Sequence, residues 1–201
     1  MDYKGVTRET YNQVAEQYEI NTKDYLNRRL QDDVNLFLNL LPGKRILDAG
    51  CGPGRDSWYF KSRGFSPVGI DFSKAMVELC REKGLEAHLM DLENISFDPD
   101  SFDGVWAYAS LLHLPKDNLN PVLTTIHSLL KHQGAFYIGM KEGTFEGFVE
   151  NPKYPGQNRY FAHYTAEELE TELRKQFQIK NFSRIITESS TFINYLCRKE
   201  F

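Results

Sequence analysis

The sequence predicts a three-layer α/β domain, in which a mostly parallel sheet of seven strands is covered by helices on both faces. Short apolar runs alternate along the chain with segments of helical periodicity. The first apolar run stops at a glycine-rich turn, 48–54, directly before a helical segment. The last two apolar runs are separated by a short turn, 188–190, so they should pair as a hairpin that contributes one antiparallel strand.

The composition fits one globular domain. The chain has 201 residues, of which 41% are hydrophobic and 26% are charged, close to the averages of folded domains. No run approaches the roughly 20 apolar residues that a membrane helix needs. We therefore expect a single domain over residues 1–201 without a membrane-spanning segment.

The charges and the cysteines argue against several classes of partner and site. The chain has 24 basic and 28 acidic residues, and the basic ones occur in short groups, which disfavours a nucleic-acid partner. Three widely spaced cysteines suit neither a disulfide framework nor a zinc motif, so no metal site is expected. The first residues mix charges where a signal peptide would be apolar, and we expect a cytoplasmic protein.

Each expected element follows from its local pattern. Apolar runs predict strands over 44–50, 67–71, 86–90, 102–108, 134–140, 178–187 and 191–198. Helical spacing predicts helices over 7–18, 24–41, 55–63, 73–80, 121–130 and 165–177. The segment 141–164 holds three glycines and two prolines and is too long for a simple connection. We divide the domain into lid helices (1–42), a cofactor-binding core (43–140), a substrate-side flap (141–164), and a C-terminal helix and hairpin (165–201).

Three glycines alternate in the turn after the first strand: Gly50, Gly52 and Gly54. Glycine lets the backbone bend sharply and approach a ligand without a Cβ atom, so a ligand is expected against this loop. In the dinucleotide pattern Gly-x-Gly-x-x-Gly the third glycine comes one residue later, and Pro53 removes an N–H donor that a phosphate would use. The pattern therefore favours a ligand other than a pyrophosphate.

Acidic residues accompany the ends of three strands, where α/β sheets bind their ligands. Asp48 precedes the glycines, Asp71 ends the second strand and Asp91 follows the third. Asp71 lies at the distance along the chain where a carboxylate accepts hydrogen bonds from a ribose diol, although it could instead cap a helix. Asp91 and Leu92 would give a base an acceptor and an apolar contact, unless they form a solvated loop. Three carboxylates would suit a ligand with a positive centre.

Together these residues resemble the first motif and the two following acidic positions of the class I S-adenosylmethionine-dependent methyltransferases, which share a Rossmann-like fold. The resemblance extends from about Tyr11 to the last strand. It implies S-adenosylmethionine as the cofactor and S-adenosylhomocysteine as its product. It also implies cofactor contacts from Asp48, Gly50, Cys51, Gly52, Gly54, Asp71, Phe72, Met76, Asp91, Leu92 and Ala107.

The same resemblance assigns parts of the cofactor to these residues. The loop from Gly50 to Gly52 would lie beside the methionine moiety, with Ala107 on the same side. Asp71 would bind the ribose hydroxyls and Asp91 the adenine amino group, while Phe72 and Met76 would pack against the adenine. Tyr11 and Tyr18, in the pattern Tyr-x-x-x-Ala-x-x-Tyr, resemble the aromatic lid helix of small-molecule members. A ring face attracts a sulfonium, but this spacing also fits plain core packing.

Transfer of a methyl group from a sulfonium mainly requires alignment of the nucleophile, the methyl carbon and the sulfur. A base helps where the nucleophile carries a proton, and His113, after the fourth strand, is the candidate, with a core histidine as the alternative. Arg159 could bind a carboxylate or phosphate of the substrate while Tyr160 and Tyr164 pack against its apolar part. Docking of the flap by these aromatic residues is the alternative.

We therefore expect a methyltransferase that acts on oxygen, nitrogen or carbon of a small molecule. Residues 107–110 lack the Asp/Asn-Pro-Pro-aromatic tetrad by which related enzymes methylate adenine or glutamine nitrogens. An NAD(P)-dependent oxidoreductase is a second hypothesis, against which the early third glycine and Pro53 weigh. A non-catalytic cofactor-binding module is a third. The oligomeric state, monomer or dimer, stays open.

Overall fold

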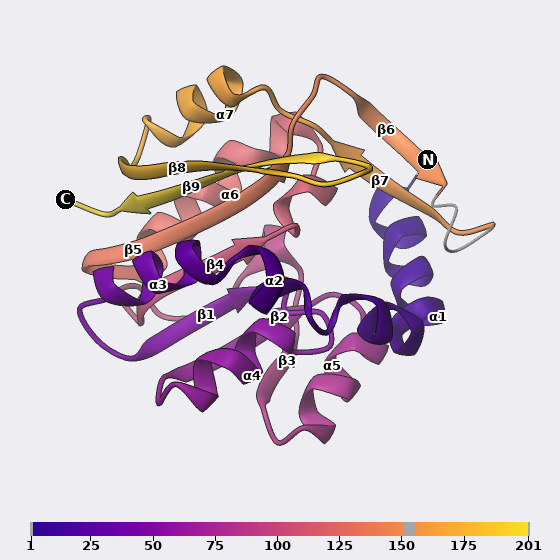
Figure 1. Cartoon of the computed structure of the whole chain (residues 1–201), viewed down its shortest axis with the longest axis horizontal. Helices are drawn as coiled ribbons and strands as arrows, with labels where there is room; N and C mark the ends of the chain where they lie inside the picture. Colours follow the sequence, from indigo (N-terminus) through magenta and orange to yellow (C-terminus); the bar gives the residue numbers. More distant parts are fainter. Residues whose placement is uncertain (1, 151–155, 201) are drawn as a thin grey trace.

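The computed structural model describes residues 2–150 and 156–200 and contains a seven-stranded sheet (Figure 1). The strand order is β3-β2-β1-β4-β5-β9-β8. The strands are β1 (Arg45–Ala49), β2 (Ser66–Asp71), β3 (Glu86–Leu89), β4 (Phe102–Tyr108), β5 (Leu130–Lys141), β8 (Gln178–Ile186) and β9 (Thr191–Arg198). The predicted mostly parallel, Rossmann-like sheet of seven strands is confirmed.

One strand, β9, runs against the others and therefore makes two antiparallel pairings, with β5 and with β8. In the last hairpin, β9 therefore lies between β5 and β8, and β8 is the edge strand of the sheet. The other described pairings within this sheet are parallel, and they join β1, β2, β3, β4 and β5. The carboxyl ends of these parallel strands all lie on the same side of the sheet, and ligands of α/β folds bind beyond these strand ends.

Helices cover both faces of the sheet because its strands alternate apolar side chains between two cores. On one face, Leu47 and Ala107 pack with α6 (Lys116–Leu129) and α7 (Ala166–Leu173). On the other, Ile46 and Trp106 pack with α3 (Gln31–Leu40) and α4 (Arg55–Ser62). The α5 helix (Lys74–Glu82) contacts β2 and β3.

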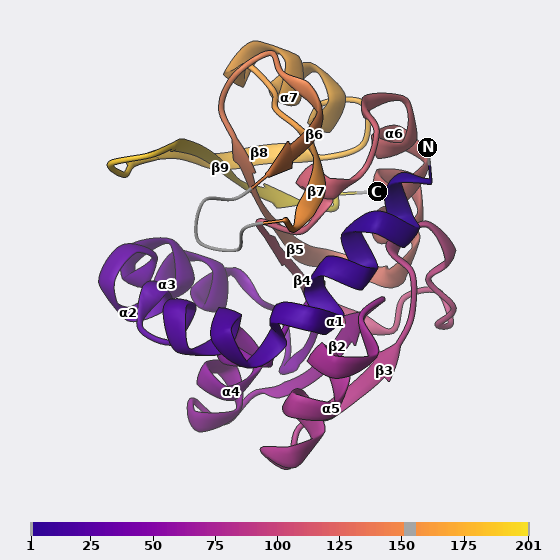
Figure 2. The same ribbon diagram turned by 90° about the vertical axis from the view of Figure 1, so that its right-hand side faces the viewer.

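The first helix, α1 (Tyr3–Thr22), is longer than the segment 7–18 that periodicity predicts. Asp2 caps it by accepting a hydrogen bond from the Gly5 amide at 3.0 Å. The helix contacts α5 and β7 (Asn158–Ala162), two elements far apart in the sequence (Figure 2). The segment 24–41, expected as one helix, is divided at Leu30 into α2 (Tyr25–Arg29) and α3.

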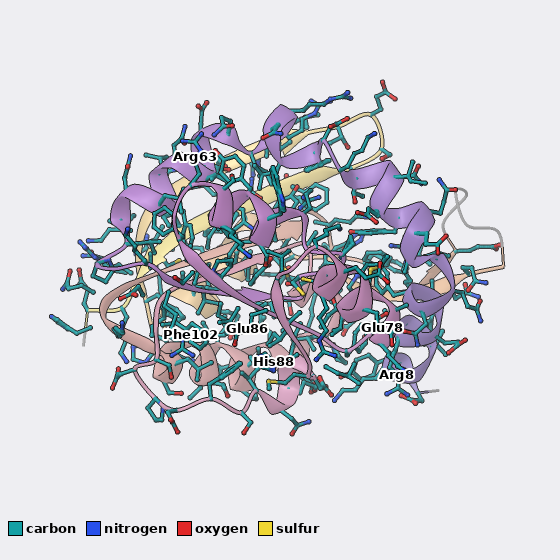
Figure 3. The ribbon with its side chains drawn as sticks, turned by 90° about the horizontal axis from the view of Figure 1, so that it is seen from below. Arg8, Arg63, Glu78, Glu86, His88 and Phe102 are labelled. Atoms are coloured by element: carbon teal, nitrogen blue, oxygen red, sulfur yellow. The ribbon has the colours of Figure 1, made fainter. Side chains whose placement is uncertain are left out.

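The segment 141–164 contains a hairpin that the glycine and proline pattern did not predict. Its strands are β6 (Glu146–Glu150) and β7, paired antiparallel, and its residues 151–155 lie outside the described part. On β3, an edge strand of the seven-stranded sheet, His88 and Glu86 form a hydrogen bond of 3.1 Å (Figure 3). Among the residues that the structure describes, no helix is both long and apolar enough to cross a membrane.

Candidate functional site

A cavity lies at the carboxyl ends of β1, β2 and β4, and α1 forms one of its walls. Many of its lining residues come from the positions that the sequence singled out. Those are Tyr11, Tyr18, Gly50, Cys51, Gly52, Asp71, Phe72, Met76, Asp91, Leu92 and His113. The fold therefore brings together eleven of the predicted site residues, from segments that span most of the chain.

The glycine loop is held close to two neighbouring strands. The amides of Gly50 and Cys51 both donate to the carbonyl oxygen of Ile70, at 2.8 and 2.9 Å. Gly50 has φ +82°, and a Cβ atom there would lie 2.3 Å from the Cβ of Ser110. Both the left-handed backbone and the close approach require glycine at this position. Gly54 has a packing role instead, because its Cβ would meet Cys80, and it does not line the cavity.

Asp71 presents a rigidly held carboxylate to the cavity. Its Oδ1 accepts from the Ser73 amide at 2.8 Å and its Oδ2 from the Gly52 amide at 3.0 Å. Burial raises the pKa of Asp71 to about 6, although the backbone donors act in the opposite direction. The carboxylate thus joins the glycine loop to the end of β2, and its remaining lone pairs can accept hydrogen bonds from a ligand.

Asp91 and Leu92 line the same cavity, but Asp91 already has partners. Its Oδ2 accepts from the Lys4 ammonium at 2.7 Å and its Oδ1 from the Glu93 amide at 3.0 Å. Lys4 lies seven residues before Tyr11, which is about two helical turns and therefore the same face of α1. That spacing is the sequence signal that could have indicated Lys4 as a lining residue.

Besides Gly54, two other predicted cofactor contacts, Asp48 and Ala107, lie outside the cavity. Asp48 is 3% exposed and accepts from the Ser57 hydroxyl at 2.6 Å, so it fixes the start of α4 beneath the loop. Burial raises the pKa of Asp48 to about 7, and the charge of Asp56 adds to the effect. Ala107 is fully buried within β4, because the strand continues to Tyr108. The residues that line the cavity there are Tyr108, Ala109 and Ser110.

A buried ion pair in the cavity wall had no signal in the sequence pattern. The Arg55 guanidinium donates to both carboxylate oxygens of Asp56, at 2.5 and 2.9 Å. Asp56 also accepts from the Trp106 indole at 2.9 Å, and Trp106 stacks on Tyr137 with ring centroids 3.9 Å apart. A fork-to-fork pair of this kind fixes Arg55 at the wall.

His113 lies at the cavity in a hydrogen-bond network whose directions can be assigned. Its Nδ1 lies 2.6 Å from the Tyr160 carbonyl oxygen, which can only accept, so Nδ1 carries the proton. Its Nε2 then accepts from the Tyr11 hydroxyl at 2.8 Å, and that hydroxyl accepts from Arg159 at 3.1 Å. Burial lowers the pKa of His113 to about 3, so the ring is neutral at physiological pH.

We expect His113 to remain neutral and protonated on Nδ1 from pH 8 down to pH 5, because its pKa of about 3 lies below that range. Nitrogen-15 NMR of histidine-labelled protein distinguishes the two tautomers and the charged ring. The same chain in denaturant is the control, since an unfolded histidine titrates near 6.5. A folded His113 that titrates near 6 would contradict this assignment.

The flap contributes one predicted residue to an adjoining cavity. Arg159 lines this second cavity with Tyr11, Tyr18 and His113, whereas Tyr160 and Tyr164 line neither cavity. Side chains alternate along a strand, and the Tyr160 hydroxyl bonds Glu146 on the neighbouring strand at 2.7 Å. Over the described residues, no cluster of three or more histidine, cysteine or acidic side chains could hold a metal ion.

Comparisons with known proteins find similar sequences among methyltransferases. Residues 46–134 match a family model described as a methyltransferase domain. The malonyl-[acyl-carrier protein] O-methyltransferase of Salmonella typhimurium is 38% identical over 82 residues, 38% of this chain and 33% of that protein. The ubiquinone biosynthesis O-methyltransferase of Xanthomonas campestris pv. campestris is 29% identical over 182 residues, 78% of this chain and 75% of that protein.

The fold has close structural counterparts. The magnesium protoporphyrin IX methyltransferase of Synechocystis PCC 6803, solved with bound S-adenosylmethionine, has a TM-score of 0.76 at 17% identity, covering 100% of this chain and 98% of that one. The chain spans only about a third of the length of the first relatives that it matches. Residues 46–134 therefore form a methyltransferase domain, and the glycine loop, the acidic strand ends and the strand order are those of the class I S-adenosylmethionine-dependent methyltransferase fold.

Proposed function

We propose that this protein transfers the methyl group of S-adenosylmethionine to oxygen, nitrogen or carbon of a small molecule, releasing S-adenosylhomocysteine. The observation that carries the proposal is the buried carboxylate of Asp71, held by the Gly52 and Ser73 amides and facing the cavity. A nucleoside with two free ribose hydroxyls satisfies a carboxylate oriented in this way. The family assignment supports the same ligand.

The residues of the cavity fit the cofactor. Phe72 and Met76 follow Asp71 along the wall and offer apolar contact to the adenine. Leu92 extends that apolar surface, while Asp91, already bonded to Lys4, would share its carboxylate between the ammonium and the adenine amino group. Gly50 and Gly52 expose backbone to the part of the cavity that would take the methionine moiety.

When bound, S-adenosylmethionine supplies an activated methyl group, so the protein's own task is to bind, orient and exclude water. The rings of Tyr11 and Tyr18 meet edge to face with centroids 5.5 Å apart, and their faces suit a positive centre. The neutral His113 reaches the cavity through the Tyr11 hydroxyl. If the acceptor loses a proton, the candidate base is His113 Nε2, whose pKa of about 3 makes it a weak base.

A small-molecule acceptor is supported by the named activities of the relatives. The Xanthomonas relative is a methyltransferase of ubiquinone biosynthesis, and a Burkholderia thailandensis structure with a TM-score of 0.69 holds 1,6-didemethyltoxoflavin and S-adenosylhomocysteine. The early third glycine and Pro53 weigh against the oxidoreductase hypothesis, since they leave a poor pyrophosphate cradle. A non-catalytic module would bind the cofactor and yield no product.

Incubation with methyl-labelled S-adenosylmethionine and a metabolite extract tests the proposed activity. We expect label in a small-molecule product, and much less product from an Asp71→Asn variant incubated in parallel at a subsaturating cofactor concentration. Binding of S-adenosylhomocysteine without any labelled product would support the module instead. Absence of both binding and product would overturn the proposal.

The affinity for S-adenosylhomocysteine should depend on the charge of Asp71. Because the pKa of Asp71 is about 6, the carboxylate is ionised at pH 8 and mostly protonated at pH 5, where it loses an acceptor. If only the ionised form binds well, the affinity falls about tenfold from pH 8 to pH 5. Calorimetry at both pH values measures this, with Asp71→Asn as the control that should show no such change. An equal affinity at both pH values in the wild type would contradict the assignment.

A further inference from the structure

The second cavity adjoins the first and has predominantly basic walls. Five basic and two acidic side chains line it: Arg28, Arg29, Arg55, Lys141 and Arg159, with Asp24 and Glu188. Arg28 is paired with Asp24, and Arg55 with Asp56. At the end of the cavity formed by β5 and β7, the cationic side chains are Lys141 and Arg159.

Lys141 and Arg159 form the centre of this basic end. The Lys141 ammonium lies 4.4 Å from the Phe161 ring centroid, and the Arg159 guanidinium lies 5.1 Å from the same centroid. Phe161 thus contacts both cations, and Arg159 also donates to the Tyr11 hydroxyl. The Arg159 side chain is nearly buried, with 7% of the residue exposed. A ring face attracts a cation through its quadrupole and carries no net negative charge.

The surroundings of Lys141 indicate an excess of positive charge. In the described part of the chain no carboxylate lies within salt-bridge distance of its ammonium. Burial lowers the pKa of Lys141, and the nearby charge of Arg159 lowers it further. Two like charges at a partly buried wall repel each other, and an anion bound between them would relieve that repulsion.

We propose that Lys141 and Arg159 bind a carboxylate or phosphate group of the methyl acceptor. This inference rests on the proposed function and names the substrate class of the same site. Both residues line the second cavity and neither lines the first. The anionic group would therefore be anchored on the acceptor side, whereas Arg55, which lines both cavities, is already paired with Asp56.

An anion site at Lys141 and Arg159 would orient the acceptor relative to the cofactor, because the two cavities share part of their lining. Tyr11 and His113 line both cavities, so an acceptor held by Lys141 and Arg159 would extend toward the cofactor past the Tyr11 hydroxyl. A fixed anion leaves the opposite end of the acceptor as the part that reaches the methyl group. Neutral and cationic molecules would lack this anchor and bind weakly.

Calorimetric titration of the S-adenosylhomocysteine-loaded protein with inorganic phosphate, and separately with benzoate, tests the proposal at constant ionic strength. We expect saturable binding of at least one anion, and Lys141→Gln should weaken it by about tenfold or more. Lys141→Arg keeps the charge and should retain binding. The control, Lys44→Gln, removes an exposed charge just before β1, at the opposite end of the strand from the loop, and should change nothing. The preferred anion distinguishes a phosphorylated from a carboxylated acceptor.

Affinity for S-adenosylhomocysteine is measured in the same samples, which distinguishes a failure of the anion site from a failure of the proposed methyltransferase function. If the cofactor product binds but neither anion does, or if Lys141→Gln binds anions as well as the wild type, the anion site is overturned and the methyltransferase proposal stands. If the cofactor product itself does not bind, both are overturned. A labelled product of the extract assay that an anion exchanger does not retain would also contradict the anion site.

Discussion

Asp71→Asn is expected to weaken the binding of S-adenosylhomocysteine by about 10- to 100-fold, since a buried hydrogen bond to a charged acceptor contributes roughly 1–3 kcal/mol. The wild-type carboxylate accepts from the Gly52 and Ser73 amides and still faces the cavity. An asparagine side chain has one carbonyl oxygen for these partners and turns an amide donor toward the ribose hydroxyls. Calorimetry at pH 8 measures the change.

The matched control is Asp32→Asn, which removes an exposed acid from the first turn of α3. It should leave the affinity unchanged. Thermal unfolding of both variants establishes that each is folded at the temperature of the titration. A folded Asp71→Asn protein that binds S-adenosylhomocysteine as tightly as the wild type would remove Asp71 from the site.

Gly50→Ala should abolish cofactor binding and lower the free energy of unfolding by about 2–5 kcal/mol, the sum of a left-handed backbone and an overpacked contact. The added Cβ would lie 2.3 Å from the Ser110 Cβ, at a residue with φ +82°. The loop would have to move away from the Ser110 side chain. That movement would strain the two hydrogen bonds from the Gly50 and Cys51 amides to the Ile70 carbonyl oxygen. Urea unfolding and calorimetry measure the two effects.

Gly64→Ala is the control for this change, because Gly64 also has φ +82° but nothing lies within 4 Å of an added Cβ. It should cost only the backbone strain, about 1–2 kcal/mol, and leave cofactor binding intact. Equal destabilisation by the two substitutions would show that the contact with Ser110 has no energetic role, and the close approach of the loop would need another explanation.

The seven-stranded sheet could be predicted from the sequence, because apolar periodicity is a local signal and the patterns of neighbouring segments agreed with one another. The seven strands were predicted, and so was the turn at Gly50 that begins the site. The hairpin β6–β7 was missed because glycines and prolines obscured its short strands. The break at Leu30 was also missed, since Leu26, Leu30 and Phe37 keep helical spacing across it.

The candidate site was predictable where a residue follows a strand and not where it depends on long-range packing. Asp71 and Asp91 follow strand ends, and both line the cavity. Asp48 does not, because the Ser57 hydroxyl draws its carboxylate beneath the loop. Lys4 reaches Asp91 only because α1 crosses to that side of the sheet. No local pattern records where a terminal helix docks.

The partners of Arg159 show the same limit. Sequence suggested an arginine that could bind an anion, but its neighbours come from three separate elements. Tyr11 lies on α1, Phe161 on β7, and Lys141 at the end of β5. Their meeting depends on the docking of the flap against α1, where the Thr10 hydroxyl donates to the Asn158 carbonyl at 2.6 Å.

The central claim is that the bend after β1 accommodates a nucleoside thioether in place of a coenzyme with paired phosphates. Titrating ligand-free wild-type protein in a calorimeter, first with S-adenosylhomocysteine and then, in a fresh sample, with NADH, tests it most directly. We predict saturable heat at one site per chain for S-adenosylhomocysteine and none for NADH. Saturable binding of NADH with no response to S-adenosylhomocysteine would contradict the account.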